Sequence, residues 1–291
     1  TVKPEGVIEV FSAVQAMGQG IATSLAQLVV DSFGVPLDKV RIVLGDTDRG
    51  DGFGSAGSRS IFAGGSAVRV GSERIIDAAK LLAADALEVA AGDLSYADAT
   101  FTVTGTDMSI DLFTLAAKQT ERRIFVESTS TVAGPSWPNG CHICEVEIDP
   151  DTGHVEAVAY SSVNDVGRVI NPMIVLGQLD GGVVQGLGQA LCEHLQYDRE
   201  TGQLVTGSLM DYAVPHADII DLMTHELDQS TPCLNNPLGV KGVGELGTIG
   251  ATPALVNAVA DAFARNGMAS ITPLLHMPLT PARVWQLMQK T

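Results

Sequence analysis

Apolar residues recur at helical spacing in three stretches of the chain. Residues 21–34, IATSLAQLVVDSFG, predict an amphipathic helix that ends at a glycine. Alanine, isoleucine and leucine repeat with the same period over about 61–91, which predicts a second, longer helix. A third helix is expected over residues 251–267, ATPALVNAVADAFARNG, with Gly267 after its end. We expect Pro253 in its first turn, since that turn does not use the N–H that proline lacks.

Shorter apolar stretches predict strands. They are GVIEVFSAV (6–14), KVRIVLGDT (39–47), ATFTVTG (99–105), RIFVEST (123–129) and the two arms of CHICEVEIDPDTGHVEAVAYSSV (141–163). The segment Asp149-Pro-Asp-Thr-Gly153 lies between those two arms and has the residues of a tight turn, so we expect a hairpin there. Strands interspersed with helices predict a mixed α/β fold.

A cluster of prolines and glycines divides the chain. VAGPSWPNG, residues 132–140, holds two of each, and we place a domain boundary there, between 1–133 and 134–291. Each half has strands followed by a glycine-rich stretch and a helix, and in the second half GQLDGGVVQGLGQALCEHL, residues 177–195, predicts a glycine-rich entry into a helix. The expected architecture is two α/β lobes with mixed sheets flanked by helices.

Composition and charge exclude several classes of function. The 291 residues are 45% apolar and 18% charged, which suits one large or two medium folded domains. A net charge of −17 argues against nucleic acid and anionic membranes as partners, because both are bound through lysine and arginine. No apolar run has the length of a membrane span, and the first residues do not resemble a signal peptide. The few cysteines, expected to be reduced, favour a cytoplasmic protein. A start without methionine suggests a processed chain or a piece of a longer one.

Cysteine and histidine spacing does not indicate a metal held by the protein. Cys141 and Cys144 form a C-x-x-C, but they lie in a predicted strand, whose residues three apart point to opposite faces. We therefore expect structural, reduced cysteines. The six histidines lack the H-x-x-x-H and H-E-x-x-H spacings of zinc sites, so no metal ligand is predicted.

Three glycine-rich segments precede or open predicted helices: AMGQG (16–20), GSAGSRS (54–60) and DGGVVQGLG (180–188). Glycine lets backbone N–H groups turn toward an anion, and a helix N-terminus adds a partial positive charge. None of the segments has the P-loop or the dinucleotide-binding pattern. Ser58, Arg59 and Ser60 could donate to a phosphate or to the edge of a heterocycle. The alternatives are plain tight turns, and for Arg59 an ion pair with an acid such as Asp46 or Asp51.

One carboxylate lies among glycines and apolar residues. Glu245 is the acid of KGVGELGTIG, residues 241–250. A carboxylate buried among apolar groups holds a proton more tightly than an exposed one, which suits a general base, and the flanking glycines would let a bulky ligand approach. The alternative is a buried glutamate satisfied by backbone amides or by Lys241.

Taken together, the motifs resemble a known family. In order they are MGQG, FGVPLDKVRIVLGDTD, GSAGSRS, DVGRVINPMIVLGQLDGGVVQGLGQAL, NPLGVKGVGELGTIGATPALVNAV and MPLTPARVW. They resemble the C-terminal half of the molybdenum-binding catalytic subunit of the xanthine dehydrogenase and aldehyde oxidase family, and the resemblance covers nearly the whole chain. The two predicted lobes would then be its two molybdopterin-binding lobes.

The resemblance implies roles for particular residues. Glu245 matches the family's glutamate in G-V-G-E, the base beside the metal. The remaining matches are to cofactor loops: Gly18, Gln19 and Gly20 near the molybdenum and its pterin, Gly57, Ser58, Arg59 and Ser60 at the pterin dinucleotide, and Gln185 with Gly186 on a further loop. The chain has Ser55 where the family often has threonine.

The resemblance also implies a reaction and partners. The family hydroxylates aldehydes or N-heterocycles with water as the oxygen source, and Glu245 would be the general base at a molybdenum–molybdopterin centre, in its cytosine dinucleotide form. Iron–sulfur clusters and FAD are expected on partner chains, because the sequence has no cysteine runs for such clusters. The family's N-terminal half would have to come from a separate chain or a missing domain.

Two other functions remain open. The chain could be a non-catalytic cofactor-binding or structural module that is inactive without a partner, which the missing half favours. It could also be a nucleotide-dependent oxidoreductase that uses the glycine-rich loops, although the Rossmann pattern is absent. The intact glycine frame of Glu245 favours the hydroxylase.

Overall fold

The computed structural model describes residues 1–129, 132 and 134–290, and the predicted boundary at residue 133 lies outside them. The chain forms two compact units, each with its own hydrophobic core. Unit 1 comprises Thr1–Trp137, Gly167–Asn171 and Pro232–Gly242, and unit 2 comprises Pro138–Val166, Pro172–Thr231 and Val243–Thr291. The mixed α/β fold that the sequence predicts is confirmed. That the two lobes are both molybdopterin-binding stays a prediction.

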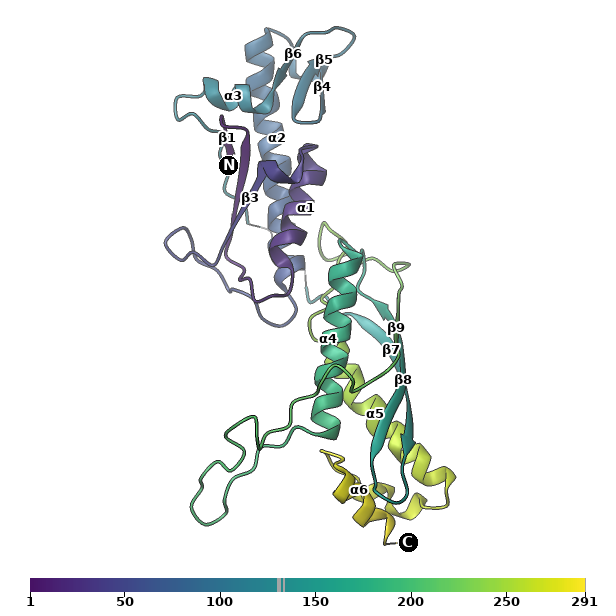
Figure 1. The fold of residues 1–291 in the computed structure, drawn as a ribbon. Coiled ribbons are helices and arrows are strands. Elements are labelled where there is room, and N and C mark those ends of the chain that lie inside the picture. Colours follow the sequence, from purple (N-terminus) through teal and green to yellow (C-terminus); the bar gives the residue numbers. More distant parts are fainter. Residues whose placement is uncertain (130–131, 133, 291) are drawn as a thin grey trace. The chain divides into compact units, whose positions relative to one another are not determined.

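Unit 1 contains two small sheets beside two long helices (Figure 1). Its strands are β1 (Val2–Lys3), β2 (Val7–Ser12), β3 (Val40–Leu44), β4 (Leu94–Ala97), β5 (Thr100–Val103) and β6 (Ser109–Asp111). Its helices are α1 (Ile21–Phe33), α2 (Ser66–Leu87), α3 (Leu112–Lys118), a π-helix (Ser60–Gly65) and the 3-10 turns Leu37–Lys39 and Ala91–Asp93. Strands β2 and β3 are parallel and α1 connects them, whereas β4, β5 and β6 form an antiparallel sheet.

The first predicted helix is confirmed, together with its end. In α1, Leu25, Val29 and Phe33 are buried on one face. Gly34 terminates the helix at φ 66°, and its N–H donates to the carbonyl of Val30. A Cβ atom at Gly34 would lie 2.7–2.9 Å from atoms of Asp98, so a glycine is needed here for both conformation and space.

Two predictions in unit 1 need correction. The long helix ends at Leu87, with its first six residues, Ser60–Gly65, wound as a π-helix. The segment RIFVEST is not a strand: Ile124 alone pairs with Val2, because β1 is two residues long and cannot extend a ladder. Beyond that bridge the segment follows α2, where Ser128 Oγ donates to the carbonyl of Ala67 at 2.9 Å.

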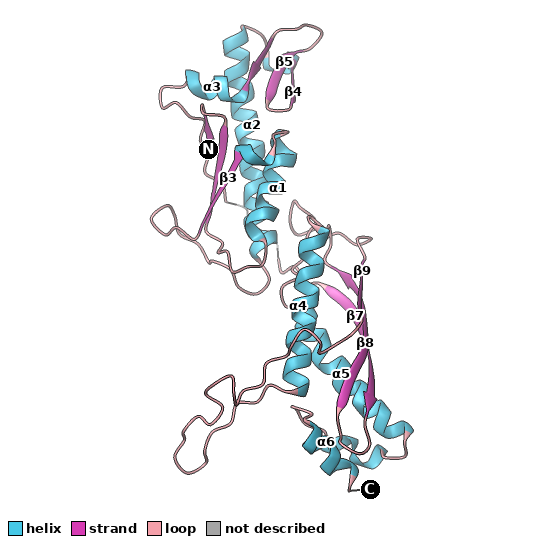
Figure 2. Cartoon of the chain, in the orientation of Figure 1, coloured by secondary structure: helices cyan, strands magenta, loops and turns pink. Residues whose placement is uncertain are grey.

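Unit 2 is a three-stranded sheet with packed helices (Figure 2). Its elements are β7 (Asn139–Ile148), β8 (Val155–Asp165), α4 (Pro172–Leu191), β9 (Met223–Leu227), α5 (Leu246–Arg265), the 3-10 helix Ala269–Leu274 and α6 (Pro281–Met288). The predicted hairpin is confirmed, since β7 and β8 are antiparallel. Gly153 in its turn has φ 74°, and a Cβ there would lie 2.3 Å from the carbonyl oxygen of Pro281.

Helices α4 and α5 cross at very short range because both carry glycines at the contact. A Cβ at Gly182 would lie 3.0 Å from Gly247 Cα, and one at Gly247 would lie 2.6 Å from the carbonyl oxygen of Leu179. The glycine-rich stretch that was predicted to enter a helix is therefore the interior of α4. The third predicted helix begins earlier than expected, so Pro253 lies inside α5 and not in its first turn.

Candidate functional site

Hydrogen bonds tie two predicted cofactor loops of unit 1 together. Ser55 Oγ accepts from the backbone N–H of Gln15 at 2.8 Å and donates to the Gln15 carbonyl at 3.1 Å. Ser60 Oγ lies 2.8 Å from the same Ser55 oxygen. Gln19 closes its own loop, since its amide donates to the Gln15 carbonyl at 2.7 Å and accepts from Met17 N–H at 2.7 Å. The loops 15–20 and 55–60 are thus one structure, joined through Ser55 and Gln15, of which the sequence did not single out Gln15.

The backbone of these loops turns through several residues in the left-handed region. Gly18, Gly20 and Gly57 have φ values of 91°, 75° and 59°, and Ser58 shares this left-handed region at 53°. Gly20 is the N-cap of α1, whose first turn receives no side-chain cap. The carbonyl oxygen of Ser58 would be 2.5 Å from a Cβ at Gly242, so that glycine allows the loop to pack against the 232–242 segment. An uncapped helix start after a Gly-Gln-Gly turn suits an anion.

Arg59 is exposed, and its guanidinium lies over the ring of Phe53, 3.8 Å from the centroid. Its Nε donates to the Ala56 carbonyl at 3.4 Å. The alternative of an ion pair with Asp46 or Asp51 is not observed within residues 1–129, 132 and 134–290. The stacking holds the side chain at the surface, with donors directed away from the ring still available.

The structure corrects the expected burial of Glu245, which is exposed. Glu245 is the N-cap residue of α5, and the buried residues of that turn are its neighbours Leu246 and Gly247. Ile249, one turn further along the same face, is 69% exposed. The Glu245 side chain makes no capping hydrogen bond to the helix.

Gln185 and Gly186 lie within α4, so the prediction of a loop at these residues is wrong. Gly186 is a packing position: a Cβ there would lie 2.7 Å from the Cβ of Ala251. Gln185 is exposed, and its Oε1 accepts from Thr248 Oγ1 at 3.0 Å. Unit 2 thus brings Gln185 beside the first turn of α5, which follows Glu245. A role for either residue in cofactor binding stays a prediction.

Sequence reasoning missed a buried polar network in unit 2. On one face of β8, Tyr160, Ser162 and Asn164 are all buried. The Tyr160 hydroxyl lies 2.6 Å from His142 Nδ1, and Ser162 Oγ lies 2.6 Å from Nδ1 of His225. Burial lowers the pKa of His142. The signal was present in AYSSVN, where polar groups alternate with period two along a strand whose other residues are apolar or small.

The cysteines follow the strand prediction. All four are free; Cys141 is exposed and Cys144 is half-buried, as opposite faces of β7 require. Burial raises the pKa of Cys144 to about 11. Within the described part of the chain no three histidine, cysteine or acidic side chains gather as metal ligands. Nor, in that part, does any helix have the length and apolarity needed to cross a membrane.

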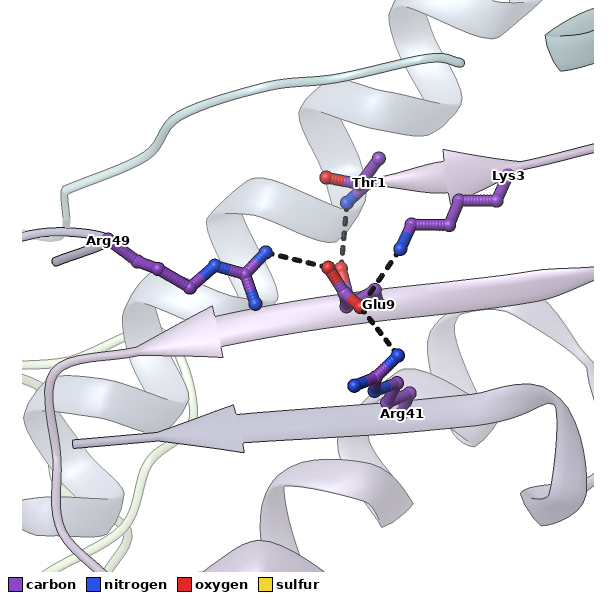
Figure 3. Close-up of polar contacts among 5 residues, drawn as sticks. All are labelled: Thr1, Lys3, Glu9, Arg41 and Arg49. Carbon is purple, nitrogen blue, oxygen red and sulfur yellow. Dashed lines mark hydrogen bonds and ion pairs between the residues drawn. The ribbon is translucent and has the colours of Figure 1, made fainter. Parts of the chain in front are cut away.

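A separate charged cluster surrounds Glu9, which is 5% exposed (Figure 3). Its carboxylate lies 2.7 Å from Arg49, 2.9 Å from Lys3 and 3.5 Å from Arg41, its cross-strand neighbour. The hydrogen bond from Arg49 outweighs burial and lowers the pKa of Glu9 to about 2. Glu9 and Arg49 border a cavity of about 530 Å³ in unit 1, whose lining includes none of the predicted site residues. The cluster is therefore structural.

Comparison with known proteins decides the family. A sequence model of the molybdopterin cofactor-binding domain matches residues 1–220. The chain belongs to this family. It is 33% identical to subunit gamma of the 6-hydroxypseudooxynicotine dehydrogenase complex of Paenarthrobacter nicotinovorans, over 98% of this chain and 36% of that subunit.

Solved structures of the same family agree. Quinoline 2-oxidoreductase from Pseudomonas putida 86 is 33% identical, with a TM-score of 0.82 over 99% of this chain and 37% of that one. Reconstituted CO dehydrogenase from Oligotropha carboxidovorans is 31% identical, with a TM-score of 0.86 over 99% of this chain and 36% of that one. This molybdopterin cofactor-binding chain therefore spans little more than a third of the length of the proteins it matches, and it has their fold over that part.

Proposed function

We propose that the chain is the C-terminal, cofactor-binding part of a molybdenum hydroxylase large subunit, with Glu245 as general base. The reaction would oxidise an aldehyde or an N-heterocycle with water as oxygen source. A molybdenum–molybdopterin group, in its cytosine dinucleotide form, would supply a Lewis acid and an acceptor of two electrons. Relatives named for quinoline, CO and 6-hydroxypseudooxynicotine support this class of enzyme without selecting a substrate.

The observation that carries the proposal is the exposure of Glu245 at the N-cap of α5. A base must reach the proton that it removes. Gly244 before it and Gly247 after it add no side chains that could cover the carboxylate. Leu246 turns into the core and fixes the backbone beside it. The residue is thus an exposed acid whose backbone is fixed by the packing of Leu246.

The loops of unit 1 fit the proposed cofactor. A pterin dinucleotide offers phosphates and heterocycle edges, both of which accept hydrogen bonds from amides. Gly18 and Gly20 turn the backbone before the uncapped start of α1, and no atom lies within 4 Å of a Cβ placed on Gly18. Arg59 and Ser58 would add side-chain donors from the second loop. These residues would hold the group without a metal ligand from the protein.

The proposed partners follow from the family, in which one relative is a subunit of a dehydrogenase complex. Electrons would leave the cofactor through an iron–sulfur chain toward a flavin subunit, since the four cysteines of this chain do not form the runs that hold iron–sulfur clusters. The other two-thirds of the relatives' length, as a separate chain or a further domain, would complete the substrate pocket. That coverage also supports a second candidate, a cofactor-binding module that is inactive when isolated.

The test is Glu245→Gln in the complete complex. The amide keeps the shape of the side chain but cannot accept the proton, so we expect turnover to be abolished while molybdenum content stays at the wild-type value. Glu156→Gln, the same change at an exposed position of β8, is the matched control and should behave as wild type. Wild-type turnover by Glu245→Gln would remove the proposed role.

A further inference from the structure

Gly250 ends the glycine-rich segment 241–250 and has a contact of its own. A Cβ atom at Gly250 would lie 2.4–2.6 Å from three atoms of the His142 ring, Nδ1, Cγ and Cε1. Such distances are not found between real side chains, so a glycine is required for the ring to lie against α5. The ring of His142, on strand β7, therefore lies directly against the backbone of α5 at Gly250.

Tyr160 holds the His142 ring in place. Its hydroxyl lies 2.6 Å from His142 Nδ1, and the two rings meet edge to face, with centroids 5.7 Å apart and planes at 80°. Tyr160 is completely buried. Burial lowers the pKa of His142 and raises the pKa of Tyr160, because it disfavours the charged form of each group.

The His142 contact lies one turn from Glu245. Ile249, directly before Gly250, donates its N–H to the Glu245 carbonyl at 3.1 Å. A displacement of Gly250 is therefore passed to Glu245 through a single hydrogen-bonded turn. The same turn is fixed on α4, where Thr248 Oγ1 donates to the Gly182 carbonyl at 3.0 Å. The start of α5 thus contacts both helix α4 and strand β7.

We infer that His142 is a positioning residue for Glu245: its ring, held by Tyr160 and seated on Gly250, sets where the first turn of α5 places the carboxylate. The inference rests on the proposed function of Glu245. It adds that the glycine at position 250 serves the geometry of the base and not direct contact with a cofactor. A general base misplaced by about 1 Å can lose on the order of 100-fold in rate.

The test uses the complete complex and the variant Gly250→Ala, whose methyl group overlaps the ring. We expect kcat to fall about 10- to 100-fold, with KM within about twofold and molybdenum content unchanged. Hydrogen exchange of the peptide 245–251, followed by mass spectrometry, should become faster. Gly181→Ala, at an exposed helical glycine with no atom within 4 Å of the added Cβ, is the control and should match wild type.

A volume-compensating pair separates positioning from general damage. In His142→Ala/Gly250→Ala the new methyl group enters the space that the ring leaves, so kcat should recover about tenfold relative to Gly250→Ala. A double variant no better than Gly250→Ala, or a Gly250→Ala with wild-type kcat and exchange, would overturn the inference. If Gly250→Ala does not fold, His142→Ala alone decides: slower turnover with faster exchange at 245–251 supports the inference, and wild-type values overturn it.

Glu245→Gln, measured in the same experiment, distinguishes the proposed function of Glu245 from the positioning role of His142. Wild-type turnover in Glu245→Gln would end the proposed function whatever the Gly250 variants do. An inactive Glu245→Gln together with an unaffected Gly250→Ala would leave Glu245 as the base and remove His142 as its positioning residue.

Discussion

Glu9 and Glu245 are both single carboxylates among apolar neighbours in the sequence, yet the structure places them in opposite environments. Glu9, in VIEVF, is buried and meets three cations from β1, β3 and the segment after β3. Glu245, in VGELG, is exposed because its turn buries the residues that follow it. Apolar neighbours alone therefore do not decide whether a carboxylate is buried. The decisive factor is which side of the element faces the core.

Glu9→Gln is expected to destabilise the protein by about 2 kcal/mol at pH 7. This value takes into account that the lysine and arginine partners of Glu9 are partly exposed, so solvent screens their attraction. The folded pKa of Glu9, about 2, lies below its ordinary value of 4.5. The stabilisation is therefore complete above pH 4.5 and is lost as the pH falls toward 2. Chemical denaturation of the wild type and of Glu9→Gln from pH 7 to pH 2 should show the difference between their free energies of unfolding shrinking as the pH falls from 4.5 to 2. Glu5→Gln, an exposed neighbour, is the control; a pH-independent difference would contradict the account.

Ser55 gives a second prediction at this scale. Ser55→Ala removes the two hydrogen bonds that join the loops 15–20 and 55–60, and a third, to Ser60, within the loop 55–60. We expect cofactor retention to fall by about tenfold, which corresponds to roughly one lost net hydrogen bond. Ser55→Thr keeps the hydroxyl and should retain the cofactor. Molybdenum and nucleotide content after gel filtration of the complex measures this, and equal retention in Ser55→Ala would show that the tie between the loops is irrelevant to binding.

Among the elements, the crossing of α4 and α5 explains much of the glycine in the second half of the sequence. Gly182, Gly186 and Gly247 let two backbones meet, and Thr248 and Thr252 each donate to a carbonyl of α4, Thr252 to that of Gly186 at 3.2 Å. Such glycines look like loop residues in a sequence, because glycine lowers helix propensity. Tertiary packing outweighs that cost here, and the hydrogen-bonded partners on the two helices are 66 residues apart in the sequence.

Gly186→Ala should destabilise the protein by about 1–3 kcal/mol, because the added methyl overlaps Ala251 at a crossing that cannot widen without moving α5. Gly181→Ala, on the exposed side of the same helix, should be neutral or stabilising by about 0.5–1 kcal/mol. Thermal unfolding of the two variants measures the difference. Equal stability would mean that Gly186 is not a packing residue, and its assignment to a cofactor site would regain weight.

The helices and the hairpin could be predicted because their signals are local. The period of α1 and its glycine end, and the turn at Asp149–Gly153, each lie within a few residues of what they determine. RIFVEST could not be predicted in the same way. Whether it becomes a strand depends on the length of its partner β1, which lies far from it in the sequence. The pairing of loops through Gln15 and Ser55, 40 residues apart, is likewise invisible to periodicity.

For the whole molecule, the division into units does not follow a single cut in the chain. Gly167–Asn171 and Pro232–Gly242 belong to unit 1, although both lie in the second half of the sequence. Gln27 of α1 illustrates the packing, donating to the Ile170 carbonyl at 2.7 Å. The proposed base, in the turn after Gly242, therefore follows directly on a segment of unit 1.

The central claim is that this chain holds a molybdenum cofactor through its own loops. The most direct measurement is molybdenum analysis, with mass spectrometry of the released nucleotide, on the complete complex purified through this chain. The account predicts molybdenum equimolar with the chain, together with pterin and CMP, and loss of both in a variant that combines Ser55→Ala with Arg59→Ala. A fully assembled complex that turns over substrate without molybdenum or pterin would contradict it.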